Sequence, residues 1–115
     1  MLKLEELGLW HGFNVKTLAH YHPNDVMICT VVGRLEVIIA PSWDRLFVYA
    51  GKDGAPENYS PVDFKSPDMR NYPDFRFATK YKMKLNPGDC LYLPAYWWQQ
   101  VEIGKQETIA IMHYY

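Results

Sequence analysis

Residues 85–101 decide the fold of this 115-residue chain, and they read LNPGDCLYLPAYWWQQV. Residues 86–89, Asn-Pro-Gly-Asp, fit a type II turn, which prefers proline at its second position and glycine at its third. A short apolar run follows the turn, and then come a proline, two adjacent tryptophans and Gln99. The segment therefore predicts a tight turn, a buried strand and an aromatic entry into the next strand.

Apolar runs on both sides of this segment predict further strands. Residues 26–32 and 35–40 are rich in β-branched side chains and meet at Gly33, which predicts a hairpin with its turn there. Residues 97–103 and 108–114 predict a last pair of strands, joined as a second hairpin by residues 104–106. Many short strands with little helix indicate an all-β sandwich or barrel.

The remaining segments give weaker local signals. Residues 2–9 fit either a short helix or a leading strand, and residues 15–22 fit a strand. Residues 80–85 alternate lysines with apolar side chains, as in a strand with one wet face. The lysine stripe is expected to be a solvated face or a protein contact. Residues 41–79, rich in proline and aromatics, predict a long, packed and partly irregular insert.

Composition narrows the possible functions. A length of 115 residues predicts one domain, residues 1–115. The net charge of −1, without a basic block, argues against nucleic acid as a partner. Cys29 and Cys90 lie in apolar runs and are interpreted as buried free thiols of an intracellular, reducing compartment, with a disulfide as the alternative. No apolar segment is long enough to predict a membrane span, and the N-terminal acids do not fit a signal peptide.

Two separated segments resemble the JmjC and JmjC-like cupin oxygenases. Residues 85–101 carry the family's turn, strand, proline and paired aromatics, with Gln99 at the position of a metal-binding histidine. Residues 17–22, TLAHYH, match a stretch that in the family ends in His-x-Asp or His-x-Glu. The resemblance covers the chain from about Phe13 onward and implies a double-stranded β-helix. It also implies that His20, His22 and Gln99 stand at the three iron-ligand positions.

The chain departs from the family's pattern at the positions that the chemistry needs. His22 replaces the acidic ligand, and Gln99 replaces the distal histidine. Leu35 stands where many members have a lysine that binds 2-oxoglutarate, and Val26 stands where an asparagine is often found. Thr17 does match a residue that contacts this cosubstrate in some members.

These departures predict a pseudoenzyme without a cofactor. Non-haem iron oxygenases use two histidines and one carboxylate on one face. Without the carboxylate, the lysine and the second imidazole, both iron and 2-oxoglutarate lose charged partners that are hard to replace in a dry pocket. The primary prediction is a non-catalytic structural or binding subunit of a larger protein assembly.

Other functions stay open. His113 on the last strand, if it points inward, completes a three-histidine site for Zn, Fe, Ni or Cu with His20 and His22. Otherwise it is hydrogen-bonded in the core or exposed. The second reading is an Fe(II)/2-oxoglutarate-dependent protein hydroxylase or another metal-dependent dioxygenase, and the third is a small-molecule-binding cupin.

The pattern of apolar residues predicts protein partners. Residues 26–32 and 109–112 are apolar on both strand faces, and such strands need cover on both. Because little helix is expected, other protein subunits are the predicted cover for the outer face and for part of residues 43–77. The side chains expected in the core are Trp98, Leu91, Leu93, Ile28 and Ile109.

Overall fold

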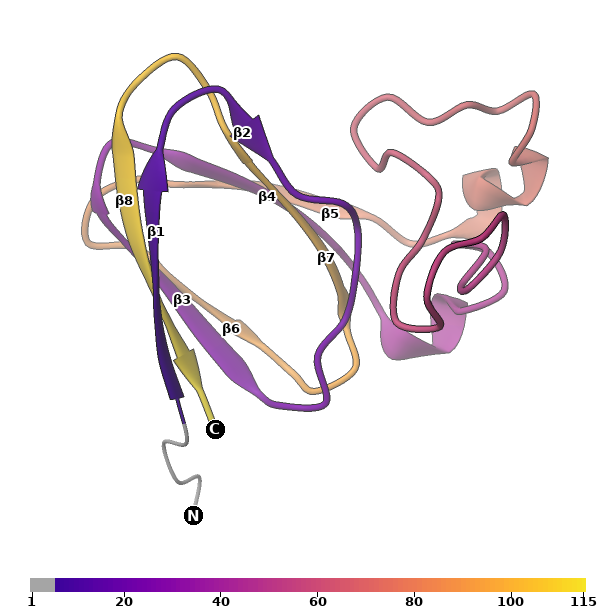
Figure 1. Ribbon diagram of the computed structural model, residues 1–115, viewed down its shortest axis with the longest axis horizontal. Helices are drawn as coiled ribbons and strands as arrows, with labels where there is room; N and C mark the ends of the chain where they lie inside the picture. The colour runs from indigo at the N-terminus through magenta and orange to yellow at the C-terminus, as the bar shows by residue number, and fades with distance from the viewer. Residues whose placement is uncertain (1–5) are drawn as a thin grey trace.

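The computed structural model describes residues 6–115, which form two four-stranded sheets that face each other (Figure 1). Sheet A has the strand order β1-β8-β3-β6, sheet B has the order β2-β7-β4-β5, and all pairs are antiparallel. The strands are β1 (Glu6–Gly12), β2 (Val15–Lys16), β3 (Val26–Val32), β4 (Leu35–Ala40), β5 (Tyr81–Leu85), β6 (Cys90–Leu93), β7 (Trp98–Ile103) and β8 (Thr108–Tyr114). The predicted double-stranded β-helix is confirmed. The leading strand expected near the N-terminus is β1, and residues 2–5 lie outside the described range.

The two predicted hairpins are wrong. β3 belongs to sheet A and pairs with β6 and β8, whereas β4 belongs to sheet B and pairs with β5 and β7. Gly33, with φ of +78°, therefore turns the chain from one sheet to the other. The same holds for residues 104–107, which lead from β7 in sheet B to β8 in sheet A. Apolar runs and turn residues locate strands, but they do not say which strands pair.

The space between the sheets is filled by aliphatic side chains. Alternate residues of each strand point inward, as the two-residue period of a strand requires. The buried cluster comprises Val26, Ile28, Leu35, Val37, Ile39, Leu85, Leu93, Val101, Ile103, Ala110 and Met112. Ile28 and Leu93 are therefore buried as predicted, while Leu91 and Ile109 are only partly buried.

A second apolar cluster lies on the opposite, outer face of sheet B. Trp98, Ile38 and Ala40 on this face pack against Val48, Val62, Phe64 and Phe75 of the insert. The insert contains two short 3₁₀ helices, Ser42–Asp44 and Pro73–Phe77, and it lies beside sheet B in Figure 1. The insert therefore covers much of this face of sheet B. Trp98 is buried as predicted, but between the sheet and the insert.

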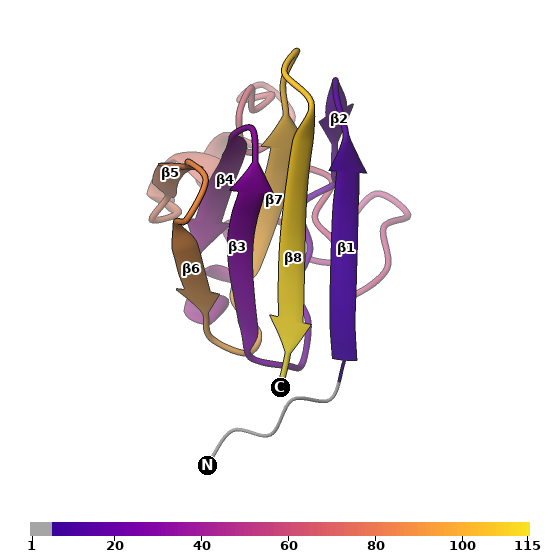
Figure 2. The same ribbon diagram turned by 90° about the vertical axis from the view of Figure 1, so that its left-hand side faces the viewer.

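The outer face of sheet A has no such cover among the described residues. Figure 2 shows β6, β3, β8 and β1 side by side, with no described segment crossing in front of them. A cross-strand row on this face joins Leu9, Ile111, Cys29 and Cys90. Leu9 is 68% exposed and Tyr92, further along β6, is 45% exposed. An apolar sheet face is thus open to contact.

The two cysteines form a disulfide across this face, which contradicts the expectation of free thiols. Cys29 and Cys90 are direct partners in the β3–β6 ladder, with their Cα atoms 4.1 Å apart. Pairs this close belong to the narrow positions of an antiparallel ladder, where side chains approach each other. The inference of a reducing compartment rested on free thiols and loses that support. Separately, none of the helices described is long and apolar enough to span a membrane.

Candidate functional site

His20 is held by backbone contacts on both sides. It forms isolated β-bridges with Gln99 at the start of β7 and with Tyr59 of the insert. The N–H of His20 donates to the Gln99 carbonyl at 3.0 Å, and the N–H of Gln99 donates back to the His20 carbonyl at 2.8 Å. The two positions that the resemblance assigned to ligands one and three therefore face each other directly.

The imidazoles of His20 and His22 meet at their Nε2 atoms. These atoms lie 3.1 Å apart, because residues i and i+2 of an extended segment point to one side. Nδ1 of His20 lies 2.8 Å from the Leu18 carbonyl oxygen, which can only accept a hydrogen bond. Nδ1 of His20 is therefore the protonated nitrogen in the neutral ring. Its Nε2 then accepts a hydrogen bond from Nε2 of His22.

Aromatic rings surround this pair. The Tyr59 ring stacks on His20 with centroids 5.2 Å apart. The Tyr114 ring meets the His22 ring edge-on at 5.3 Å. Both imidazoles are partly buried. The site is thus a half-exposed histidine pair in an aromatic rim.

The structure does not bring His113 to this pair. On β8 the inward side chains are Ala110 and Met112, so His113 points to the outer face of sheet A. Its ladder partners are Leu7 and Met27, and its Nδ1 lies 3.4 Å from the Met27 carbonyl oxygen. Tyr114, one residue further on, contacts His22 through its ring. The three-histidine arrangement is absent from this geometry.

The side chains at the positions equivalent to the cosubstrate pocket are either aliphatic or already hydrogen-bonded to the chain itself. Val26 and Leu35 are both fully buried in the cluster between the sheets. Oγ1 of Thr17 accepts a hydrogen bond from the Val101 N–H at 2.9 Å and so helps to fix the chain against β7. Gln99 is buried, and its side chain is a neutral amide.

The residues present do not fit Fe(II) and 2-oxoglutarate. Two converging imidazoles could supply two of the three ligands, but residues 6–115 contain no group of three His, Cys, Asp or Glu side chains that could hold a metal ion. The facial triad of the oxygenases requires a carboxylate beside two histidines. The buried Val26 and Leu35 provide no counter-charge for a dicarboxylate.

The sequence reasoning missed a polar cluster that anchors the insert. Asp63 accepts hydrogen bonds from Nζ of Lys16 at 2.8 Å and from Nε2 of the buried Gln100 at 2.8 Å. Oε1 of Gln100 accepts from the Phe64 N–H at 2.8 Å. Burial alone would raise the pKa of Asp63, but these hydrogen bonds, with two from backbone N–H groups, outweigh it and hold the pKa well below 3.8. The available signal was Gln100, a polar residue on the same strand face as the apolar Trp98.

The two facing sheets, the crossed connections and the histidine pair at the rim define a cupin-type double-stranded β-helix. The chain belongs to the cupin-like domain family, which matches residues 3–115. Solved structures with the same fold include dTDP-4-dehydrorhamnose 3,5-epimerase from Elizabethkingia anophelis (TM-score 0.57, 9% identity, 97% of this chain and 50% of that chain). An oxalate decarboxylase from Bacillus subtilis is similar over 92% of this chain and 19% of that chain (TM-score 0.55, 12% identity). At such low identity these likenesses show the fold alone.

Curated relatives place the chain near JmjC proteins. It is 33% identical over 82 residues to Jumonji C domain-containing protein 5 of Drosophila melanogaster, covering 71% of this chain and 20% of that protein. It is 35% identical over 78 residues to tRNA wybutosine-synthesizing protein 5 of Danio rerio, covering 68% and 23%. It is 30% identical over 113 residues to human HSPB1-associated protein 1, covering 93% and 23%. The chain thus spans less than a quarter of the length of these relatives.

Proposed function

We propose that this chain is a non-catalytic JmjC-like cupin module that serves as a structural or binding unit of a larger protein assembly. The observation that carries the proposal is that several residues needed for the oxygenase reaction are replaced together. Gln99 stands opposite His20 as a neutral amide, and Val26 and Leu35 lie in the aliphatic core. A family member with these residues keeps the scaffold of the barrel while its reaction site is changed.

The charges explain why these changes act together. The cosubstrate 2-oxoglutarate carries two carboxylates, and burying an anion without a partner is costly. A leucine at position 35 and a valine at position 26 provide aliphatic surface where a cation and an amide are needed. Loss of the acidic ligand at His22 removes the anion that balances Fe(II). Restoring one of these features leaves the others missing.

The outer face of sheet A supports the binding part of the proposal. Leu9, Ile111 and Tyr92 lie on this face without cover from the described chain. Specific protein interfaces bury about 1,200–2,000 Å² in total and have an apolar centre. An uncovered apolar sheet is otherwise an aggregation hazard. We therefore propose that protein subunits cover this face in the native assembly.

The first experiment tests catalysis. The purified chain is incubated anaerobically with Fe(II), freed of unbound metal and examined by elemental analysis, and succinate formation from 2-oxoglutarate is then measured in air. We expect substoichiometric iron and no succinate above the protein-free control. Stoichiometric iron together with succinate formation would support the alternative, an Fe(II)/2-oxoglutarate-dependent hydroxylase. The observation in favour of that alternative is the His20–His22 pair, whose Nε2 atoms face each other as two ligands of one ion would.

The second experiment tests the interface. We expect the isolated chain to self-associate, and the double variant Leu9→Lys/Val31→Lys to shift it towards monomer in light scattering. Both side chains are exposed, so the substitution does not disturb the core. The matched control is Leu18→Lys, which adds a charge at an exposed leucine away from sheet A and leaves association unchanged. A wild-type chain that stays a stable monomer at high concentration would count against the subunit proposal.

A further inference from the structure

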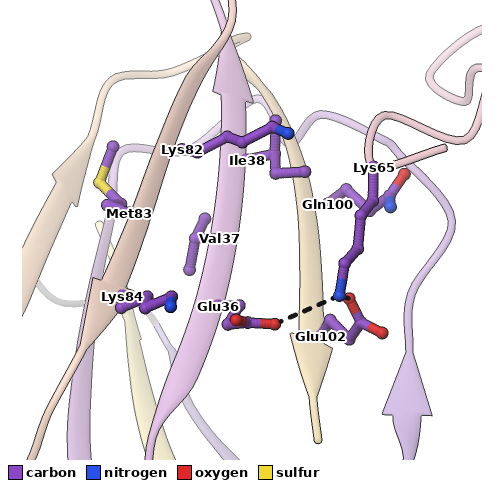
Figure 3. A pocket seen from close by; sticks show the side chains of 9 residues that line it. All are labelled: Glu36, Val37, Ile38, Lys65, Lys82, Met83, Lys84, Gln100 and Glu102. Atoms are coloured by element: carbon purple, nitrogen blue, oxygen red, sulfur yellow. Dashed lines mark hydrogen bonds and ion pairs between the residues drawn. The ribbon is translucent and has the colours of Figure 1, made fainter. Parts of the chain in front are cut away.

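A groove of about 400 Å³ lies on the outer face of sheet B, outside the barrel interior and away from the histidine pair. It lies where the insert leaves the sheet uncovered. Glu36 and Ile38 of β4 form its base, with Glu102 of β7 on one side and Lys82 and Lys84 of β5 on the other. Lys65 of the insert forms the opposite wall, as Figure 3 shows. Its volume lies in the range typical of small-molecule sites, about 300–1,000 Å³.

The wall formed by the insert is fixed in place. Nζ of Lys65 lies 2.7 Å from Oε2 of Glu102 and 3.5 Å from Oε2 of Glu36. The hydrogen bond to Glu102 is the main reason why the pKa of Lys65 lies above its ordinary value. The Phe64 N–H bonded to Gln100 holds the adjacent backbone against β7. The groove is therefore preformed, and its two carboxylates share one ammonium group.

The opposite rim carries two lysines that form no direct ion pair among the described residues. The ion pairs of residues 6–115 include Lys16, Lys65 and Arg45 but neither Lys82 nor Lys84. Both side chains extend from the edge strand β5 towards β4, and that of Lys82 reaches across to Ile38 (Figure 3). In the ladder, the aliphatic Ile38 of the central strand lies directly opposite Lys82, and Glu36 lies opposite Lys84. Two ammonium groups beside the aliphatic side chain of Ile38 suit a molecule with an anionic head and an apolar body.

We propose that this groove binds a small organic anion, with its carboxylate, phosphate or sulfonate between Lys82 and Lys84 and its apolar body on Ile38. The site is independent of the proposed non-catalytic role, since no groove residue belongs to the metal or cosubstrate positions. Lysines on an edge strand also prevent strands of other molecules from pairing with it. That role needs only charge at the edge, whereas a binding groove needs charge and apolar surface together.

The test compares two fluorescent probes of nearly equal shape. Anilinonaphthalene sulfonate carries an anionic group, and phenylnaphthylamine has the same aromatic body without charge. We expect the anionic probe to bind saturably to the wild type. Its affinity should fall by about tenfold or more in Lys82→Gln/Lys84→Gln, because hydrogen bonds to charged groups are lost. Binding of the uncharged probe should change little in the same variant.

Matched variants separate the groove from other apolar surfaces. Lys80→Gln is the control, since Lys80 lies on the same edge but places its Nζ 4.8 Å from the centre of the Phe75 ring, outside the groove. Glu36→Gln should strengthen binding of the anionic probe, because it removes a repelling charge. Equal affinity in wild type and in Lys82→Gln/Lys84→Gln would overturn the proposal. Loss of anionic-probe binding in Leu9→Lys/Val31→Lys would also overturn it, because that result would place the probe on sheet A.

Discussion

Nε2 of His20 and Nε2 of His22 lie 3.1 Å apart at the rim of the barrel, and Nδ1 of His20 is bound to the Leu18 carbonyl. The outer hydrogen bond orients one imidazole so that its remaining nitrogen faces the other. In metal sites, ligating histidines are oriented in the same way by an acceptor on the far nitrogen. Two imidazoles are thus arranged as two ligands of one metal ion would be, and Gln99 faces His20 across a β-bridge.

Restoring the missing ligands should restore metal affinity but not turnover. The variant His22→Asp/Gln99→His supplies two histidines and one carboxylate, and we expect it to bind Co(II) at least about tenfold more tightly than wild type. Succinate formation should stay absent, because Leu35 still occupies the position of the cosubstrate lysine. Titration by Co(II) absorbance and a succinate assay measure the two effects. In the same background His113→Ala should leave the affinity unchanged, and a loss of metal would show that His113 reaches the site.

Removal of the Trp98 ring should destabilise the domain strongly. Trp98 is 1% exposed and joins sheet B to the insert, where its ring also contacts Tyr21 at 5.0 Å. Trp98→Ala should cost about 3–5 kcal/mol of unfolding free energy, as expected for a large-to-small change in a core. Trp43, 73% exposed, is the control, and Trp43→Ala should cost less than about 1 kcal/mol. Urea denaturation followed by circular dichroism gives both values. Near wild-type stability of Trp98→Ala would show that the insert does not depend on this contact.

A methyl group at Gly33 should be far more harmful than one at Gly54. Both glycines have positive φ, +78° and +81°, so alanine is strained at either position. A Cβ at Gly54 meets open space, whereas a Cβ at Gly33 would overlap the Glu107 carbonyl oxygen and the Thr108 side chain. Gly54→Ala should therefore cost about 1–2 kcal/mol, and Gly33→Ala clearly more. Thermal unfolding of the two variants measures the difference, and equal losses would mean that the crossing between β3 and β4 is looser than described.

The anchor of the insert should respond to acid. The pKa of Asp63 is lower in the folded chain than in the unfolded chain, so its carboxylate stabilises the fold above the unfolded pKa of about 4. That contribution is lost as the pH falls through the folded pKa. The stability difference between wild type and Asp63→Asn should therefore be largest near neutral pH and should shrink below about pH 4. Lys16→Met should lower the free energy of unfolding of the wild type, but it should cause little further loss in the Asp63→Asn background. Urea titrations across this range check both expectations.

Local features of the fold could be predicted from the sequence. The turn at residues 86–89 forms with Gly88 at φ of +92°, as the type II pattern requires. The alternation in β5 buries Leu85 and exposes Lys82 and Lys84. These features depend on neighbours in the chain. They could be predicted because steric preferences and the two-residue period of a strand act over only a few residues.

Features that depend on pairing between segments far apart in the sequence could not be predicted. Cys29 and Cys90 are 61 positions apart and meet only because β3 pairs with β6. The insert was expected to be packed, but nothing in its aromatic content indicates that its site is the outer face of sheet B. His113 was placed near the pocket, yet a difference of one residue along a strand reverses the face. The groove beside Lys65 likewise requires three strands and the insert to be in place.

The disulfide has a further consequence for cleavage of the chain. Cys29 and Cys90 close a covalent ring that contains β4, the entire insert and β5. Residues 52–54 lie in this ring and are exposed, and Lys52 offers a trypsin site. A cut there should leave one molecule without reductant and release two fragments when reductant is added, as electrophoresis would show. Val48 on one side of the cut and Phe64 on the other pack in the same cluster, so the nicked form should keep its shape. The protein is thereby able to exist as two polypeptides while remaining one covalent body.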